Sequence, residues 1–192
     1  MKRMKIAVIA AQVLTLCMGA AGCSASNPKV EIEMQDGGKI DIELDRKNAP
    51  ITVDNFLSLV NSGFYDGLTF HRIVPGFVIQ GGDPNGDGSG GSDKTIKGEF
   101  TENGVNNTIK HVRGVISMAR SQDNNSASSQ FFITLADVRQ SLDGKYAAFG
   151  KVVSGMDVVD KIAAVPNSGG MENRALEPVV IKSIKVIDAG QQ

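Results

Sequence analysis

The stretch that decides how this chain folds runs from residue 70 to residue 83 and reads FHRIVPGFVIQGGD. A single arginine, Arg72, lies among bulky apolar residues, and Phe77, Val78 and Gln80 follow it closely. A guanidinium is costly to bury unless its five N–H donors find acceptors. This stretch alone leaves two interpretations open. Arg72 is either a solvated charge on the wet face of a half-buried strand, paired with a carboxylate, or a functional residue.

The composition is that of an ordinary globular domain. A chain of 192 residues suits one domain whose core needs no disulfide or metal to stabilise it. Its 22 glycines, few aromatic residues and lack of tryptophan favour a fold rich in turns and strands over a helical bundle. The net charge of −1 gives no indication of nucleic-acid binding, and we expect a monomer.

The N-terminus has the pattern of an export signal. A basic start, MKRMK, precedes an apolar run from Ile6 to Leu16, which is too short for a comfortable membrane span. The run ends in Ala20, Ala21, Gly22 and Cys23, which resembles the bacterial lipobox, whose cysteine is lipidated before the signal is cleaved just ahead of it. The alternative is a plain secretory signal, with Cys23 incidental.

The sequence therefore predicts three segments. Residues 1–22 are a signal peptide of the lipoprotein type, residues 23–29 a short linker that begins with lipidated Cys23, and residues 30–192 one folded domain. We expect an extracytoplasmic domain held at a membrane by its lipid anchor. Since Cys17 leaves with the signal, the folded domain contains no thiol.

Hydrophobic periodicity indicates a mainly antiparallel β protein with two helices. Alternating residues at Val30 to Met34 and Lys39 to Leu44 predict a hairpin, and helical spacing predicts helices over Ile51 to Asn61 and Met156 to Ala164. Periodicity does not choose between a barrel and a sandwich. Further strands are expected near residues 67–74, 77–80, 95–100, 112–119, 129–135, 147–153 and 179–187.

Several familiar motifs are incomplete, because the residues that their chemistry requires are missing. The DPNGDG run that starts at Asp83 fits the front of an EF-hand loop, but Lys94 stands where the bidentate glutamate is required. The two histidines, His71 and His111, have no nearby partner ligand. There is also no G-x-S-x-G elbow and no plausible cysteine nucleophile. We therefore expect no metal, no cofactor and no hydrolytic chemistry.

Two further segments carry unusual patterns. Residues 115–134 read VISMARSQDNNSASSQFFIT, a polar loop between two apolar strands, and residues 141–152 read SLDGKYAAFGKV. With the first stretch, and in this order, they resemble the cyclophilin family of peptidyl-prolyl cis–trans isomerases, from about Val30 to the C-terminus. The resemblance implies a closed eight-stranded antiparallel barrel capped by two helices. It also implies an enzyme that accelerates rotation about X–Pro bonds in proline-containing polypeptides.

The resemblance assigns the main roles of a catalytic site. Arg72 occupies the position of the family's catalytic arginine. Phe77, Val78 and Phe132, with Leu142 beside them, would line the pocket that receives the proline ring. Many relatives place methionine where this chain has Val78, and the replacement keeps an apolar wall.

The remaining carried-over residues would hold the substrate. Gln80 and Gln130 would position the arginine and bind substrate backbone, while Ala119 and Arg120 would line the groove for the residue before proline. Tyr146 stands where many relatives have a pocket histidine. Arg120 has a second interpretation as a solvated loop charge, and the sequence slightly favours that one.

Two departures from the family pattern affect ligands. Ser141 falls where many eukaryotic relatives carry a tryptophan linked to cyclosporin affinity, so we do not expect tight binding of that drug. The loop from Arg120 to Ser129 is one residue longer than in those relatives, which leaves the local groove contacts open.

A rival interpretation comes from another class of protein. Some cyclophilin-like domains bind proline-containing segments without useful turnover and act as adaptors or chaperones. The sequence favours the enzyme, because a pure binder need not retain Arg72, Gln80 and Gln130 together with the apolar pocket. We expect its clients to be exported or surface proteins whose folding waits on proline isomerisation.

Overall fold

The computed structural model describes residues 27–170 and 172–190. The predicted signal peptide and Cys23 lie outside these residues. Within the described part of the chain, no helix is both long enough and apolar enough to cross a membrane.

The predicted N-terminal hairpin is confirmed. Strands β1 (Lys29–Met34) and β2 (Lys39–Leu44) pair antiparallel, with Ile32 opposite Ile40. Every second residue of both strands is buried, as the alternation of apolar residues requires. The hairpin therefore presents one apolar face to the core and one charged face to solvent.

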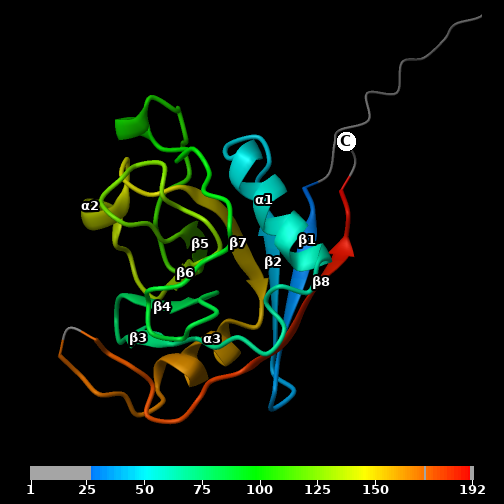
Figure 1. Ribbon diagram of the computed structural model, residues 1–192, viewed down its shortest axis with the longest axis vertical. Coiled ribbons are helices and arrows are strands. Elements are labelled where there is room, and N and C mark those ends of the chain that lie inside the picture. The colour runs from blue at the N-terminus through cyan, green and yellow to red at the C-terminus, as the bar shows by residue number, and fades with distance from the viewer. Residues whose placement is uncertain (1–26, 171, 191–192) are drawn as a thin grey trace, which may run out of the picture.

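Eight strands form one antiparallel sheet in the order β3-β4-β6-β5-β7-β2-β1-β8 (Figure 1). The short strands β3, β4, β6 and β5 lie side by side and carry the site described below. The other strands of the sheet are β3 (Arg72–Val74), β4 (Val78–Gly81), β5 (Val115–Met118), β6 (Phe131–Thr134), β7 (Ala148–Ser154) and β8 (Ile181–Asp188).

The expectation of a closed barrel is wrong, because the edge strands β3 and β8 do not form a ladder. The segments before them meet instead through an isolated bridge between Thr69 and Val180. Three backbone hydrogen bonds surround this bridge, from Gly67 N–H to Ile181 O, from Ile181 N–H to Leu68 O and from Phe70 N–H to Val179 O. Pro178, next along the chain, has no N–H with which to extend them into a ladder. The strand expected over 67–74 is reduced to the three residues of β3. The sheet is an open half-barrel.

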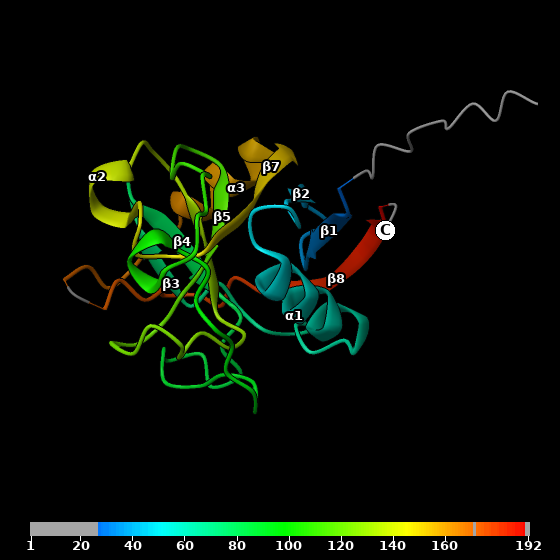
Figure 2. The ribbon, with the colours of Figure 1, turned by 90° about the horizontal axis from the view of Figure 1, so that it is seen from above.

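Both predicted helices are confirmed. Helices α1 (Pro50–Asn61) and α3 (Met156–Ala163) lie on opposite sides of the curved sheet (Figures 1 and 2). From α1, the Phe56 ring enters the core and contacts the rings of Tyr65, Phe131 and Phe149 at centroid distances of 5.2, 5.6 and 5.2 Å. This aromatic cluster holds α1 against the strands.

Two short helices were not predicted: a 3-10 turn, η1 (Thr101–Asn103), and a single helical turn, α2 (Arg139–Leu142). Each is about one turn long, which is too short to give a periodic hydrophobic signal.

The strand predicted near residues 95–100 is wrong. Only one bridge forms there, between Ile96 and Ala127. Side chains occupy the backbone groups that a ladder would need: the Gly98 N–H donates to the Asn125 side chain at 3.2 Å, and the Gly98 carbonyl accepts from Asn103 at 2.7 Å. The segment is therefore a loop ordered by asparagine side chains.

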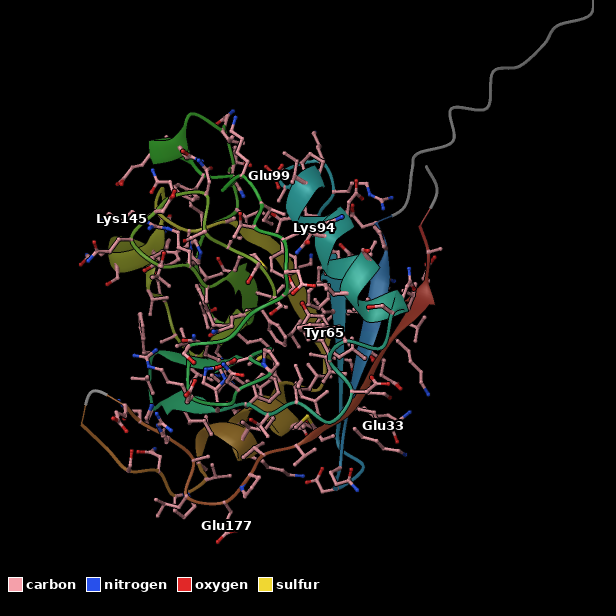
Figure 3. All side chains as sticks on the ribbon, in the orientation of Figure 1. Glu33, Tyr65, Lys94, Glu99, Lys145 and Glu177 are labelled. Atoms are coloured by element: carbon pink, nitrogen blue, oxygen red, sulfur yellow. The ribbon has the colours of Figure 1, made fainter. Side chains whose placement is uncertain are left out.

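The same loop caps α1. Residue Ala49, which precedes the helix, offers no side-chain cap. The buried carboxylate of Glu99 accepts hydrogen bonds from the N–H groups of Ile51 and Thr52 at 3.1 and 2.7 Å, and from the Thr52 hydroxyl at 2.7 Å (Figure 3). A negative charge at the N-terminus of a helix also interacts favourably with the helix dipole.

Replacing Glu99 with glutamine tests this cap. The amide keeps the size of the side chain but removes the charge and turns an NH₂ group toward N–H donors. We expect Glu99→Gln to lower the free energy of unfolding by about 1–3 kcal/mol, measured by urea denaturation. Glu102→Gln, on the exposed η1 turn, is the matched control and should change it by less than about 0.5 kcal/mol. Equal effects of the two substitutions would contradict the capping role.

Candidate active site

The catalytic candidate lies in a row of side chains that crosses three strands. Arg72 of β3 is directly paired with Gln80 of β4, which is paired with Phe132 of β6. Directly opposed residues of antiparallel strands point to the same face of a sheet. The register therefore places a cation, an amide and an aromatic ring side by side on the outer face of the half-barrel. The sequence brought these three residues together only through the family resemblance.

A chain of hydrogen bonds orients the arginine. Arg72 Nη1 donates to Gln80 Oε1 at 3.3 Å, and Gln80 Nε2 donates to Gln130 Oε1 at 2.8 Å. Gln130 Nε2 in turn donates to the carbonyls of Gly88 and Gly90 at 3.1 and 2.7 Å. Each amide is thus fixed by a donor on one side and an acceptor on the other.

The arginine itself is held by only one of these bonds. Among the described residues, no carboxylate lies within ion-pair distance of Arg72. The interpretation of Arg72 as a strand charge paired with a carboxylate therefore fails. Its other guanidinium N–H groups have no partner among the described residues and can bind a ligand.

Next to Arg72 lies an apolar pocket that is separate from the main core. Val78, Phe132 and Leu142 form its buried part, and the rings of Phe132 and Tyr146 meet edge to face at 5.8 Å. The structure thus brings together every residue that the resemblance assigned to the proline pocket. The partly buried residues packed around it are Val74, Phe77, Ala119, Val138 and Tyr146.

Arg120 is half-buried and packs on two aromatic rings. Its guanidinium carbon lies 5.1 Å from the centre of the Phe100 ring and 4.9 Å from that of Tyr146, and its Nε donates to the Lys145 carbonyl at 2.9 Å. Stacking on two rings fixes this side chain and ties the long polar loop to the turn at Lys145.

A groove of about 370 Å³ adjoins the apolar pocket. Ala119 and Arg120 form one wall, and Gln80 and Gln130 line it as well. Serine side chains of the surrounding loops make the rest of the groove polar. The residues predicted to accommodate the residue before proline therefore do line one groove.

Sequence reasoning missed one part of the site, the buried His111. Its ring stacks on Phe132 at a centroid distance of 6.3 Å and an angle of 25°. Its Nδ1 lies 2.9 Å from Asp143 Oδ1, and its Nε2 lies 3.0 Å from the Ser117 hydroxyl. No spacing rule connects residues 32 positions apart, so the sequence gave no signal for this contact.

The environment keeps this histidine neutral. Burial lowers the pKa of His111, although the nearby Asp143 carboxylate acts in the opposite direction. A neutral ring donates a hydrogen bond from Nδ1 to Asp143 and accepts one at Nε2 from the Ser117 hydroxyl. The uncharged His111 ring therefore lies between β5 and the turn at Asp143 and packs against the Phe132 ring.

The pH dependence of stability tests this arrangement. Burial also lowers the pKa of His71, so both histidines of the chain bind protons more weakly when it is folded. As the pH falls below about 6.5, the unfolded chain is protonated first and the folded state loses stability. We expect the free energy of unfolding to fall between pH 7.5 and 5.5, and His111→Gln to reduce the slope. A slope that is flat in the original protein, or unchanged in the variant, would contradict this account.

Comparison with known proteins agrees with the geometry. The family model for cyclophilin-type peptidyl-prolyl cis-trans isomerases matches residues 29–186. The chain is 41% identical over 196 residues to peptidyl-prolyl cis-trans isomerase A of Dickeya dadantii, an alignment that covers 97% of this chain and 98% of the relative. It is 42% identical over 166 residues to a peptidyl-prolyl cis-trans isomerase of Acinetobacter baylyi, covering 81% of this chain and 84% of the relative.

Solved structures give the same result. A cyclophilin-type isomerase of Cryptosporidium parvum superposes with a TM-score of 0.74 at 32% identity, covering 83% of this chain and 97% of that one. A second crystal structure of that protein, obtained in the presence of the dipeptide Ala-Pro, gives a TM-score of 0.73 at 33% identity, with 82% and 98% covered. By fold, by site and by sequence, this chain belongs to the cyclophilin-type peptidyl-prolyl cis–trans isomerase family.

Proposed function

We propose that this isomerase turns X–Pro bonds in exported polypeptides by means of Arg72, acting beside the Phe132 pocket. One observation supports the catalytic part of this proposal. Gln80 orients Arg72 in the same row as the aromatic ring of the pocket, and among the described residues this is the only hydrogen bond of the guanidinium donors. A proline ring seated on Phe132 brings its amide nitrogen to the arginine side of the pocket.

The reaction needs a hydrogen-bond donor rather than a nucleophile. Resonance opposes rotation about a peptide bond with a barrier of ~18–20 kcal/mol, yet no covalent bond is made or broken. In the twisted transition state the nitrogen lone pair is no longer conjugated, so it can accept a hydrogen bond. A guanidinium that donates to this nitrogen, or to a carbonyl that swings toward it, stabilises the transition state more than either isomer.

Magnitudes show that the arginine does not act alone. A ~10⁵-fold acceleration corresponds to about 7 kcal/mol. One well-placed donor supplies ~2.7–4 kcal/mol. The remainder comes from holding the ring still between Phe77, Phe132 and Leu142 while the chain before it rotates, and from excluding water around the bond.

The adaptor interpretation receives less support from the same geometry. A binding module needs only the apolar pocket and the groove. The hydrogen-bonded pair of Gln80 and Gln130 adds nothing to the apolar contacts, but it orients the arginine. This arrangement is expected of a site that acts on a transition state.

Substitution of the arginine tests the catalytic proposal. We expect Arg72→Ala to lower kcat/KM on a short X–Pro peptide by roughly 10²–10³-fold in an NMR exchange assay, because one donor is lost while the pocket stays. Arg72→Lys should recover only part of this, since an ammonium lacks the planar fork. Arg46→Ala is the control, because Arg46 is a half-buried arginine that pairs with the exposed Asp54.

Two results would contradict the proposal. Near-original turnover by Arg72→Ala would assign the donor elsewhere. Peptide binding by the original protein without any turnover would instead favour the adaptor.

We also propose that the protein is exported and anchored to a membrane by lipid. The basic start, short apolar run and Cys23 support an exported lipoprotein, whose anchor would lie only a few residues before β1 begins at Lys29. Five intervening residues span at most roughly 18 Å. The domain would then act close to a membrane surface, on proteins that fold after export.

Replacing Cys23 with serine tests the anchor. If Cys23 carries lipid, the protein expressed with its own leader should partition into the detergent phase and take up labelled palmitate. Cys23→Ser should remove the label and move the protein to the aqueous phase, while isomerase activity stays the same. Cys17→Ser, within the apolar leader, is the control and should change neither. A Cys23→Ser protein that is still labelled would place the lipid elsewhere.

A further inference from the structure

A second polar hollow of about 250 Å³ lies on the other side of Arg72. Arg174, in the loop before β8, forms an isolated antiparallel bridge with Arg72. The row that runs from Phe132 through Gln80 to Arg72 therefore continues one position beyond the edge strand. We call this hollow the arginine pocket; it is lined by His71, Arg72, Gln80, Asp87, Glu172 and Arg174.

The two guanidiniums of the arginine pocket are only weakly engaged. Arg174 pairs with Glu172 at 3.2 Å, but their side chains are 47% and 70% exposed, and such surface pairs contribute little. The other carboxylate of the pocket, that of Asp87, accepts hydrogen bonds from the N–H and hydroxyl of Ser89. Arg174 also donates to the Asp87 carbonyl at 3.5 Å, so an incoming anion competes with one exposed carboxylate and one long hydrogen bond.

A buried histidine gives independent evidence of a polar site. His71 is 7% exposed, and neither of its ring nitrogens has a hydrogen-bond partner among the described residues. Buried polar groups of native proteins are nearly always paired. This imidazole lines the arginine pocket beside Arg72.

The order of the strands sets the position of a ligand relative to the proline. The groove at Ala119 follows β5, Phe132 is on β6, and the arginine pocket lies beyond β3. A peptide that crosses the strands in this order passes the pocket after its proline. Three strand spacings amount to ~14 Å, and the Arg174 side chain shortens the distance, so an extended chain covers it in about two or three residues.

We propose that the arginine pocket binds a carboxylate of the substrate, that of an acidic residue two or three positions after the isomerised proline. Arg72 and Arg174 donate to it together, and Glu172 occupies Arg174 until the substrate arrives. The inference rests on the proposed function, because it assigns a substrate preference to the same site. It makes this enzyme selective for X–Pro bonds followed by an acidic side chain.

A peptide series tests the preference. Matched X–Pro peptides carry Glu, Gln or Lys two or three positions after proline, and a further set carries the same residues two positions before it. We expect kcat/KM for Glu to exceed that for Gln by roughly three- to tenfold, only when the residue follows proline, and the ratio to fall with added salt. A preference for Glu before proline would overturn the proposed direction.

Substitutions in the arginine pocket identify the residues that produce the preference for an acidic residue after proline. Arg174→Gln should bring the Glu-to-Gln ratio close to one, whereas Arg46→Gln, the control, should leave it unchanged. Glu172→Gln should raise the ratio, because it removes the competing carboxylate, and a merely structural role of Arg174 would not produce this opposite effect. Thermal unfolding of each variant verifies its fold.

These experiments distinguish a failure of the arginine pocket from a failure of the proposed isomerase function. Normal turnover with equal rates for Glu, Gln and Lys overturns the arginine pocket and leaves the isomerase function intact. If no peptide is turned over, the proposed function fails, and the ratio of dissociation constants for the same peptides, measured by NMR titration, still decides whether the pocket selects a carboxylate.

Discussion

The site depends on the register of three short strands. Because β3, β4 and β6 pair without a slip, Arg72, Gln80 and Phe132 share one face of the sheet. A shift of one residue would turn each side chain to the opposite face and bury the guanidinium in the core. The strongest local constraint on this register is the apolar alternation itself: Ile73 and Ile79, the neighbours of the site residues, are fully buried.

The two adjacent phenylalanines of β6 show how fold and function share one strand. Phe131 points into the core and packs against Phe56, Tyr65 and Phe70, while Phe132 points outward into the apolar pocket. Successive residues of a strand face opposite sides, so the core contact of one ring fixes the position of the other. The buried His111 then supports the outward ring from behind.

Much of this arrangement could be predicted from the sequence, and the rest could not for identifiable reasons. The N-terminal hairpin and both main helices follow from hydrophobic period, which is a local property. The gathering of Arg72, Gln130 and Phe132 required the family resemblance, since periodicity does not give strand order. The predictions of a closed barrel and of a strand over 95–100 are wrong, because Pro178 and asparagine side chains outside the strands determine the pairing there.

Contacts between distant loops were the hardest to foresee. The sequence leaves Arg120 open between a groove contact and a solvated charge, because its stacking partners, Phe100 and Tyr146, come from two other segments. The sequence indicates no partner for His111, although Asp143 lies at hydrogen-bonding distance from its Nδ1 and Ser117 from its Nε2. In each case the partner is a side chain that only the tertiary structure brings near.

The carboxylate of Glu99 makes α1 a conditional helix. Its first turn is completed by a residue 47 positions later in the chain, so the helix and the loop around Glu99 form one cooperative unit. A fragment that ends before the loop lacks the cap, and chain synthesis must pass residue 99 before the helix can be finished. The loop from residue 95 to residue 100, which contains no strand or helix, is therefore an unsuitable place for an insertion or a new chain terminus.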